Sequence, residues 1–435
     1  MRLSEATRSH LPCEVAQPCY DRSQPVGIVH FGIGAFHRAH QAWYTDACLQ
    51  AGERSWMIAG VSLRSGAVAE QLFAQDGLYT LTERADDDPR TRLIGAVREV
   101  LGPGDRAAIV RRIAAPDCQV VSFTVTEKGY CRAADGSLDR AQAAAGFYPL
   151  LTEALALRRD AGLPGLTLLS CDNLAANGRT LGRLMREWLD GDTKLARWFA
   201  GECATPETMV DRIVPATTPA DRATLAERIG LEDRGAVFTE PFSQWVIEDR
   251  FAGPRPRWED HGAQIVGDVT PYETAKLRML NAAHSLLAYS GLAAGYGFVH
   301  EAIGDPRLGA LARRLMIDEA LPTMAAGSGQ DLSAYAARVL ERLANPHLRH
   351  SLAQIAMDGS QKLPQRWLAT RAERARRGLA SPAIEEGMRC WLRHLRDGRH
   401  VDDPMAPRLR AAVQASPEDE GWEAIFGSNG LLRAP

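Results

Sequence analysis

A short stretch in the second half of the chain combines residue types that can perform acid–base chemistry. The sequence KLRMLNAAHS, residues 276–285, has the pattern of a buried helix, yet it contains Lys276, Asn281 and His284. At about 100° per residue, these three side chains and Glu273, one turn earlier, fall on the same face as the leucines of the segment. We therefore expect four polar groups on the apolar face of one helix.

These four residue types suit proton transfer. Burial of a polar group costs free energy unless it is satisfied, so four together indicate catalysis, whereas one histidine is usually a hydrogen-bonded core residue. A lysine among apolar groups has its charged form disfavoured, so its pKa falls toward neutrality and Lys276 can exchange a proton with an alcohol. The Asn281 amide can hydrogen-bond a developing alkoxide, His284 can hold a hydroxyl, and Glu273 can relay the proton.

The first part of the chain contains a candidate dinucleotide-binding turn. The sequence VGIVHFGIGAFHRAH passes from a β-branched apolar run into Gly32-x-Gly34 and a predicted helix through QAWYTDACLQ. Glycines let the backbone approach a pyrophosphate, and the helix start offers N–H groups. His37 stands where a third glycine is expected, so an ordinary tight turn is the alternative. The predicted cofactor contacts here are Gly32, Ile33, Gly34, Ala35 and Phe36.

The end of the second predicted strand bears on the choice of coenzyme. WMIAGVSL, residues 56–63, reads as that strand, and such a strand usually ends in an acidic residue that binds the ribose of NAD. Here Arg64 follows instead, with no Asp or Glu nearby. We predict NAD as the cofactor and keep NADP as the alternative, because Arg64 could accept a 2′-phosphate. A surface arginine explains the residue equally well.

Two further predicted strands end in polar residues. CQVVSFTVTEKGY ends in Thr126, Glu127 and Lys128, and GLTLLSCDN ends in Asp172 and Asn173. The carboxyl ends of parallel strands face the ligand crevice, so these side chains are site candidates, and Asn173 is a second candidate donor to the alkoxide. The alternative is that Asp172 or Asn173 caps the helix that follows.

The composition is that of a globular protein and excludes several classes of partner. The chain has 435 residues, 45% hydrophobic and 24% charged, with a formal net charge of −3, so we expect no nucleic-acid partner. No apolar run approaches the ~20 residues of a membrane helix, and we read no apolar leader, so we expect no membrane partner. The eight cysteines are scattered without C-x-x-C. We therefore expect reduced thiols, a cytoplasmic location and no metal site.

The order of the predicted elements gives the fold class. Strands alternate with helices in the first part of the chain, whereas the residues after about 273 read almost entirely as helices. We predict an α/β protein with an N-terminal Rossmann-type dinucleotide-binding domain, residues 1–270, and a mainly α-helical C-terminal domain, residues 271–435. Within the first of these domains, Asp211 and Arg212 could form a simple ion pair.

Several strings of the sequence resemble one family. Lys-x4-Asn-x2-His, SCDN, TMVDRIVP, GIGAFHRAHQAWYTD, TVTEKGYC and EPFSQWVIEDRF together resemble the polyol-specific long-chain dehydrogenases, the mannitol dehydrogenase family. The resemblance implies metal-independent, NAD(P)-dependent hydride transfer between a secondary alcohol and a ketone, at a site between a Rossmann-type and a helical domain. It implies that Lys276 is the general base, that Asn173 and Asn281 bind the oxyanion, that His284 positions the substrate and that Glu273 takes part in proton transfer. The binding of coenzyme would extend to Thr126 and Glu127.

The same resemblance narrows the substrate. NPHLRH, QIAMDGSQKLPQR and KLRMLN together resemble the fructuronate reductases, also called mannonate oxidoreductases, whose substrate carries a carboxylate, and TEKGY differs from the TEGGY typical of mannitol 2-dehydrogenases. The candidate partners of this substrate carboxylate are Lys128, Arg349, Lys362 and Arg366. For each of them, a structural ion pair is the alternative. We expect a monomer or weak homo-oligomer that acts on a small sugar acid or polyol.

Two other functions stay open at this point. One is a neutral-polyol dehydrogenase such as mannitol 2-dehydrogenase, acting on mannitol or arabinitol. The other is a non-catalytic coenzyme-binding sensor. Mannitol dehydrogenases typically have acidic residues just after the second strand, where this chain has Gly66 and Ala67, and this difference weighs against strict NAD specificity.

Overall fold

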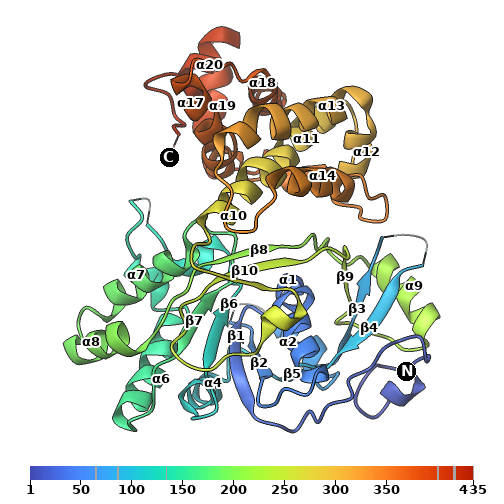
Figure 1. Cartoon of the computed structure of the whole chain (residues 1–435), viewed down its shortest axis with the longest axis vertical. Coiled ribbons are helices and arrows are strands. Elements are labelled where there is room, and N and C mark those ends of the chain that lie inside the picture. Colours follow the sequence, from blue (N-terminus) through green and yellow to red (C-terminus); the bar gives the residue numbers. More distant parts are fainter. Residues whose placement is uncertain (64–65, 86–87, 134, 399–400, 415–417, 435) are drawn as a thin grey trace. The chain divides into compact units, whose positions relative to one another are not determined.

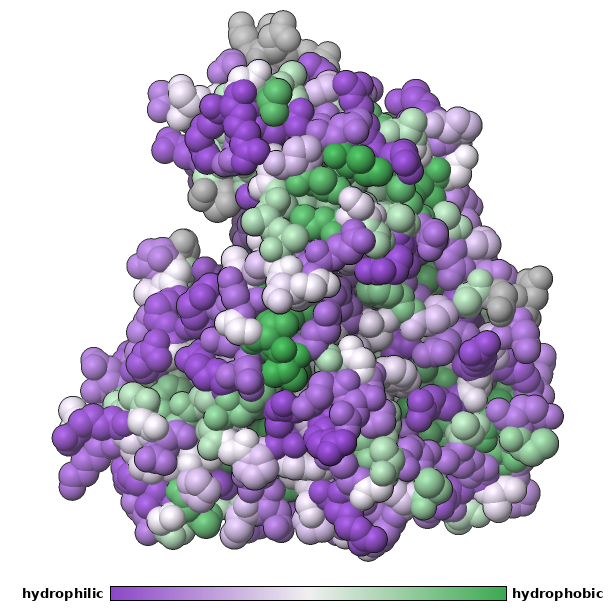
Figure 2. All heavy atoms as spheres, viewed as in Figure 1, coloured by the Kyte–Doolittle hydropathy of each residue, from purple (hydrophilic) through white to green (hydrophobic). Residues whose placement is uncertain are grey.

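The chain forms two compact units, Met1–Val269 and Thr270–Pro435. The computed structural model, shown in Figure 1, describes residues 1–63, 66–85, 88–133, 135–398, 401–414 and 418–434. Hydrophilic residues cover most of the face drawn in Figure 2. Within the described ranges, no helix combines the length and the apolar character needed to cross a bilayer.

A parallel sheet of five strands forms the centre of the first unit. The strands are β1 (Val26–Phe31), β2 (Met57–Val61), β5 (Val97–Leu101), β6 (Val120–Phe123) and β7 (Thr167–Ser170). Their spatial order is β5-β2-β1-β6-β7, and every pair is parallel. The chain therefore moves outward from β1 in one direction and then in the other, which is the order of a Rossmann fold and confirms the predicted class. The reversal lies between β1 and β6, where such sheets bind ligands.

Helices flank this sheet, and Figure 1 shows α6, α7 and α8 beside β7. Their bounds are α1 (Ala35–Ala39), α2 (Gln41–Gln50), α3 (Gly66–Phe73), α4 (Arg106–Ala114), α5 (Arg140–Ala143), α6 (Tyr148–Asp160), α7 (Asn177–Leu189), α8 (Thr193–Glu202) and α9 (Pro219–Ile229). The single helix expected after the glycine turn is in fact two, because His40 between α1 and α2 has φ −123° and ψ −94° and breaks the helical path.

Two small sheets complete the first unit. One has the order β4-β3-β9 and the other β11-β10-β8. Their strands are β3 (Tyr79–Glu83), β4 (Arg90–Ile94), β8 (Thr208–Asp211), β9 (Val237–Thr239), β10 (Gln244–Glu248) and β11 (Gln264–Val266). Arg212 is buried directly after β8 and forms an ion pair with Glu83 at 2.7 Å. Arg212 thus pairs with a strand that is distant in sequence, and this contact does not test the predicted ion pair between Asp211 and Arg212.

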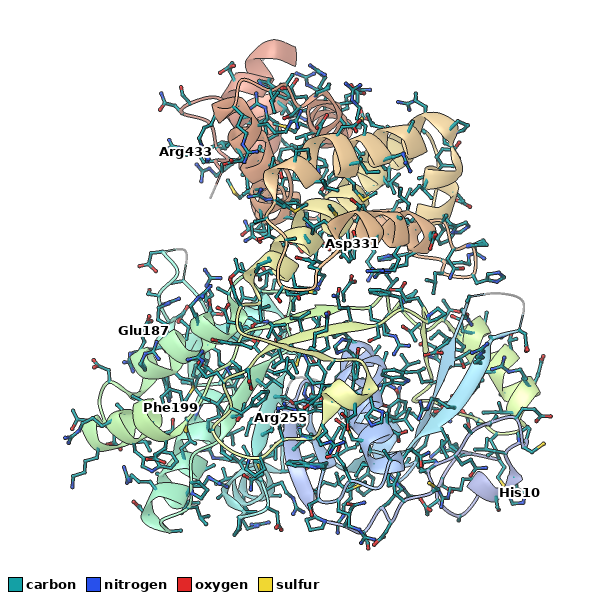
Figure 3. All side chains as sticks on the ribbon, in the orientation of Figure 1. His10, Glu187, Phe199, Arg255, Asp331 and Arg433 are labelled. Atoms are coloured by element: carbon teal, nitrogen blue, oxygen red, sulfur yellow. The ribbon has the colours of Figure 1, made fainter. Side chains whose placement is uncertain are left out.

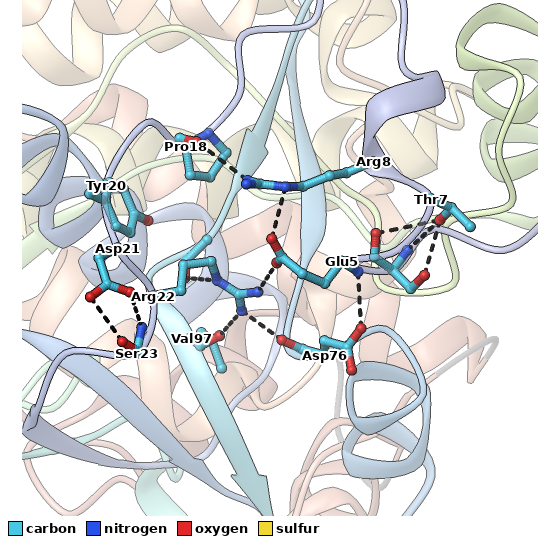
Figure 4. Close-up of polar contacts among 12 residues, drawn as sticks. Glu5, Thr7, Arg8, Pro18, Tyr20, Asp21, Arg22, Ser23, Asp76 and Val97 are labelled. Atoms are coloured by element: carbon cyan, nitrogen blue, oxygen red, sulfur yellow. Dashed lines mark hydrogen bonds and ion pairs between the residues drawn. The ribbon is translucent and has the colours of Figure 1, made fainter.

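The N-terminal segment is fastened to the first unit by one arginine, as Figure 4 shows. The Arg22 guanidinium donates to the carbonyl oxygens of Gly95 (2.9 Å), Val97 (2.8 Å) and Asp76 (2.6 Å), and it also pairs with Glu5 at 2.6 Å. Carbonyl groups at the edge of the sheet thus have donors, and the segment before β1 has a fixed course.

The second unit is helical, as predicted. Its α-helices are α10 (Thr270–Ala275), α11 (Ala282–Ala293), α12 (Val299–Gly304), α13 (Pro306–Arg314), α14 (Leu332–Leu343), α15 (Leu352–Ala356), α16 (Gly359–Leu363), α17 (Ala369–Arg376), α18 (Pro382–Asp397), α19 (Ala406–Gln414) and α20 (Glu418–Phe426). Every residue from Ala282 to Gly291 is buried, so α11 is the core helix of this unit. Asp331, labelled in Figure 3, caps α14 by accepting from the Ala334 amide at 2.9 Å.

Among the described residues of the second unit, three segments wind as π-helix rather than α-helix. They are η4 (Lys276–Asn281), η5 (Leu315–Ala320) and η7 (Pro364–Leu368), and η4 packs against both of the others. A π-turn adds a residue to the helical turn and therefore rotates the side chains that follow it. The regular 100° spacing assumed for Lys276 and Asn281 is wrong over η4 for this reason. π-Turns often mark functional sites.

Candidate active site

The turn after β1 can be built only with glycine at its first position. Gly32 has φ +97°, and a Cβ added there would overlap the carbonyl oxygen of Thr124. The Gly32 amide donates to Val61 at the end of β2 (2.8 Å), and its carbonyl accepts from the Thr124 hydroxyl at the end of β6 (2.7 Å). The turn is therefore fixed to the strands on both sides of β1.

The next residues form a cradle with open space above its backbone. A Cβ added at Gly34 would have no neighbour closer than the Gly32 oxygen at 3.8 Å, so the main chain can be approached there. Ile33 points into the sheet, where Gly60 of β2 leaves room for its side chain. Ala35 and Phe36, both half-buried, begin α1. This geometry fits the pyrophosphate of a dinucleotide coenzyme.

A buried histidine replaces the third glycine beneath this cradle. The His37 ring stacks on His30 of β1, with centroids 3.4 Å apart and an interplanar angle of 14°. The His30 ring contacts the Ser122 hydroxyl (2.8 Å) and the Thr124 hydroxyl (2.8 Å). Burial lowers the pKa of His30 to about 3 and that of His37 well below its usual range, so both rings are neutral at physiological pH. The sequence pattern gave no sign of this support from below.

The segment after β6 lies at the point where the strand order reverses. Thr126, Glu127 and Lys128 are exposed, and the last two belong to the 3₁₀ turn η2 (Glu127–Tyr130). Thr126 has φ +64°, a backbone conformation that is rare outside glycine. The structure thus places all three predicted residues at the carboxyl end of a central strand, where the sequence placed them.

The end of β7 brings Asp172 and Asn173 to the same edge of the sheet. The Asp172 carboxylate accepts from the Val125 amide (3.0 Å), the Thr126 amide (2.8 Å) and the Tyr130 hydroxyl (2.8 Å). The alternative that Asp172 or Asn173 caps the next helix is wrong, because α7 begins at Asn177 after the left-handed Ala176 and has no side-chain cap. Asn173 itself is exposed.

Arg64, the residue that bears on NADP, lies outside the residues that the structure describes. The described residues around it agree with the prediction that Arg64 follows the second strand, because β2 ends at Val61 and α3 begins at Gly66. The described residues between them carry no acidic side chain. In the part of the chain that the structure describes, no three His, Cys, Asp or Glu side chains gather into a group that could hold a metal ion.

The second unit supplies the lysine, the glutamate and the histidine of the predicted set. Glu273 lies on α10, Lys276 begins η4, Asn281 ends it, and His284 lies on the first turn of α11. Lys276 and His284 are each 7% exposed, whereas Glu273 and Asn281 are half-buried. The four residues thus follow one another along a continuous helical segment whose middle is a π-turn.

The surroundings of His284 are basic. Burial lowers the pKa of His284 well below its usual value, and His350, Arg366, Arg342 and Lys276 lower it further. The His284 and His350 rings meet edge to face, with centroids 5.1 Å apart. Sequence reasoning missed Arg342 and His350, although NPHLRH, which it singled out, contains His350. Their part in the cluster could not be seen because α14 and the loop after it are distant from α11 in sequence.

The predicted carboxylate-binding residues have different surroundings. Arg366 of η7 donates to the Asn281 carbonyl (3.2 Å) and the Ser285 hydroxyl (2.8 Å), so it lies against the predicted catalytic helix. Lys362 of α16 donates to the carbonyls of Met357 (2.6 Å) and Ile355 (3.4 Å).

The other two candidates are exposed. Arg349 has its guanidinium 4.4 Å from the centre of the Phe298 ring. Lys128 lies in the turn after β6 of the first unit. Arg366 is thus a candidate with direct hydrogen bonds to the segment that carries Asn281 and His284.

Comparison with known proteins matches both units to one family. Residues 26–260 match the family described as "Mannitol dehydrogenase Rossmann domain", and residues 268–428 match "Mannitol dehydrogenase C-terminal domain". The D-mannonate oxidoreductase of Escherichia coli is 39% identical over 98% of this chain and 92% of its own. A mannitol dehydrogenase of Saccharomyces cerevisiae is 36% identical over 90% of this chain and 83% of its own.

A solved structure has the same fold. It is the mannitol 2-dehydrogenase of Pseudomonas fluorescens in a ternary complex with NAD and D-mannitol. It superposes with a TM-score of 0.88 at 34% identity and covers 99% of this chain and 93% of its own.

Proposed function

The chain belongs to the mannitol dehydrogenase family of NAD(P)-dependent oxidoreductases that act on CH–OH groups, and from this premise we propose that it interconverts D-fructuronate and D-mannonate. The observation that supports a sugar acid as the substrate is the basic environment of His284. Arg366 and Arg342, whose guanidinium groups are always charged, lower its pKa, and Lys276 adds positive charge in its protonated form. Such an environment favours a substrate with a carboxylate over a neutral one. The likeness to a D-mannonate oxidoreductase along nearly the whole chain supports the same choice.

Lys276 is the proposed general base in alcohol oxidation and the general acid in ketone reduction. It is almost completely buried at the start of a π-turn, and burial disfavours the charged form of a lysine. A lysine whose two protonation states are close in free energy can take the hydroxyl proton and later return it. Glu273 precedes it by three residues and is half-buried, which suits a group that passes this proton toward solvent.

Asn281 and Asn173 are the proposed donors to the substrate oxygen. Their amide N–H groups are neutral donors that stabilise an alkoxide without supplying a proton. His284 has a different role in this scheme. Its pKa lies well below the usual value, so its ring is neutral and serves as a hydrogen-bond partner of a substrate hydroxyl rather than as an acid.

The proposed coenzyme is NAD, with NADP as the alternative that depends on Arg64. When bound, the nicotinamide accepts or supplies the hydride. The cradle from Gly32 to Phe36 would hold the pyrophosphate through its open backbone, and Thr126 and Glu127 border the same reversal of strand order.

The proposed partner of the substrate carboxylate is first of all Arg366. A planar guanidinium can bind a carboxylate with two parallel hydrogen bonds, and Arg366 already lies against Asn281 and Ser285. Lys362, Arg349 and Lys128 are the further candidates. Lys362 has its ammonium group on two backbone carbonyls, which favours a structural role for it.

A neutral-polyol dehydrogenase is the second candidate function. It is favoured by the solved relative that holds D-mannitol together with NAD, with which this chain shares its fold over almost its full length. In that case the basic groups around His284 would serve to keep its ring neutral rather than to bind a carboxylate.

Replacement of Lys276 by alanine tests the proposed chemistry. Lys276→Ala should abolish turnover of whichever substrate the wild-type enzyme prefers, while the affinity for NADH, measured by fluorescence titration, stays within a few-fold. Lys194→Ala, which alters an exposed lysine on α8, is the matched control. Near-normal turnover of Lys276→Ala would refute the assignment. A wild-type protein that binds NADH but converts neither sugar acids nor polyols would instead indicate a coenzyme-binding sensor.

A further inference from the structure

One buried carboxylate connects the ends of two neighbouring strands in the first unit. Asp172 follows β7, yet all three of its donors belong to the segment after β6, namely the Val125 amide, the Thr126 amide and the Tyr130 hydroxyl. The same tyrosine hydroxyl also meets the Ser170 hydroxyl of β7 at 2.6 Å. Asp172 is only 9% exposed, so these contacts form in a protected environment.

The segment held by Asp172 has a backbone conformation that needs support. Thr126 has φ +64° and ψ 165°, and a non-glycine residue in such a region costs of order 1–3 kcal/mol unless its surroundings enforce it. Its amide donates to Asp172, and its carbonyl accepts from the Gly129 amide at 2.9 Å. Tyr130 is fixed in turn, because its carbonyl accepts from the Tyr148 hydroxyl at 2.8 Å.

The residues on either side of this connection are the ones with proposed roles. Asn173, the next residue along the chain, is exposed and is a proposed donor to the substrate oxygen. Thr126, Glu127 and Lys128 are exposed on the segment that Asp172 holds. A shift of the Asp172 backbone would therefore move Asn173 relative to these three residues.

We propose that Asp172 is a positioning residue, whose carboxylate fixes the turn after β6 against the end of β7 and thereby holds Asn173 and the Thr126–Lys128 segment in one productive arrangement. This inference rests on the proposed function for the meaning of "productive", but the geometry it describes lies wholly within the first unit.

The charge of Asp172 should matter to this role. The ionised carboxylate is the better acceptor for all three donors, because protonation turns one of its oxygens into an O–H donor and a weaker acceptor. Burial raises the pKa of Asp172 to about 6, while the hydrogen bonds from Tyr130, Val125 and Thr126 oppose that rise and the Glu127 charge adds to it. Cys171 is a further buried neighbour, and burial together with Asp172 keeps its thiol pKa well above the usual value. As the pH falls through about 6, the protonated carboxyl loses acceptor capacity and the turn loses a contact.

A purely structural role is the main rival, and the chain contains a matched control for it. Asp233 is also a buried aspartate of the first unit with burial as the cause of its raised pKa. It accepts from the Thr80 amide (2.6 Å), the Thr80 hydroxyl (2.7 Å), the Gly235 amide (2.8 Å) and Gln75 (2.8 Å). Asp233→Asn should therefore lower stability as Asp172→Asn does, but it does not touch the ends of β6 and β7.

The test compares Asp172→Asn with Asp233→Asn in the full-length protein. Asparagine must turn an N–H group toward at least one donor. We expect both variants to melt earlier, but only Asp172→Asn should lower kcat, by roughly 10²-fold, because displacements of about 1 Å cost that much. Only in Asp172→Asn should the fall of kcat/KM at acidic pH disappear. Equal effects of the two variants on kcat per folded molecule, or an unchanged kcat and pH profile in Asp172→Asn, would overturn the proposal.

Two further measurements keep the inference testable if Asp172→Asn folds poorly or the substrate is not the one proposed. Tyr130→Phe removes one of the three donors to Asp172 and should lower kcat less than Asp172→Asn does. The fall of kcat/KM at acidic pH should persist in Tyr130→Phe. Hydrogen exchange of the amides of Val125 and Thr126 should be slow in the wild type and in Asp233→Asn but fast in Asp172→Asn. Equal exchange rates in all three proteins would refute the proposal that Asp172 fixes the turn after β6. A wild type that is inactive on every sugar acid and polyol would refute only the proposed function.

Discussion

Three buried histidines and the half-buried His350 make the stability of this protein depend on pH at the level of single residues. Burial lowers the pKa of His350 to about 4 and that of His30 to about 3, and it lowers the pKa of His37 and His284 well below the usual value. In the unfolded chain each would titrate near 6.5. The neutral rings therefore contribute their full stabilisation of the fold above about pH 6.5. This stabilisation is lost as the pH falls toward the pKa values of the folded state.

His350 offers the clearest test of this dependence, because burial alone accounts for its shift. Between pH 7.5 and pH 5, the wild type should lose roughly 1–2 kcal/mol more of its free energy of unfolding than His350→Gln does. Urea unfolding at the two pH values measures the difference. Titrating groups that do not interact with His350 cancel between the proteins, whereas His284, whose pKa His350 helps to lower, does not cancel fully. His10→Gln, which changes an exposed histidine, should behave as the wild type. A parallel loss in His350→Gln would show that the folded His350 is protonated as easily as the unfolded one.

At this scale, the sequence predicted residue types well and their neighbours poorly. Lys276 and His284 could be identified because a charged or polar side chain inside an apolar helix is itself a signal, and both are buried. His350 and Arg342 could not be placed, since their proximity to His284 comes from the packing of distant helices. Asp172 was read as a candidate for the site or a helix cap. Its actual partners after β6 depend on the pairing of two strands.

At the scale of elements, the turn after β1 gives a prediction about coenzyme affinity. Gly32→Ala places a Cβ against the Thr124 carbonyl and forces a non-glycine residue into φ +97°. Strain of this kind costs of order 1–3 kcal/mol, and about 1.4 kcal/mol is tenfold in affinity. We therefore expect the Kd for NADH, measured by fluorescence titration, to rise by roughly 5- to 100-fold. Gly104→Ala, at a position with no atom within 4 Å of the added Cβ, is the control. If both variants bound NADH as tightly as the wild type, the cradle would not be the pyrophosphate site.

The elements that the sequence predicted are those with a local signal. The strands β1, β2, β6 and β7 are apolar runs that the sequence identified, and the glycine turn carries its own conformational requirement. The fifth strand, β5, was missed because Arg98 and Glu99 interrupt its apolar residues. The break at His40 and the π-turn from Lys276 to Asn281 were missed, because neither contains the proline or glycine that usually signals an irregular helix. Both irregularities occur where the helix packs against other elements, His40 against Trp245 and η4 against η5 and η7.

At the scale of the whole molecule, the family is much better determined than the substrate. The match to both family domains depends on many residues spread over the chain. The proposed choice between a sugar acid and a neutral polyol depends on a few cationic side chains, among them Arg366, which donates to Asn281 and Ser285. Sequence alone could name such cations but could not rank them, because their surroundings are set by the packing of η7 and α16 on distant helices.

The initial rate of NADH oxidation with D-fructuronate, measured beside D-fructose at the nicotinamide absorbance, tests the central claim most directly. The account predicts a strong preference for fructuronate, and the same assay with NADPH should give the lower rate. Preference for fructose would contradict the sugar-acid assignment, make the protein a neutral-polyol dehydrogenase and leave Arg366 with a structural role.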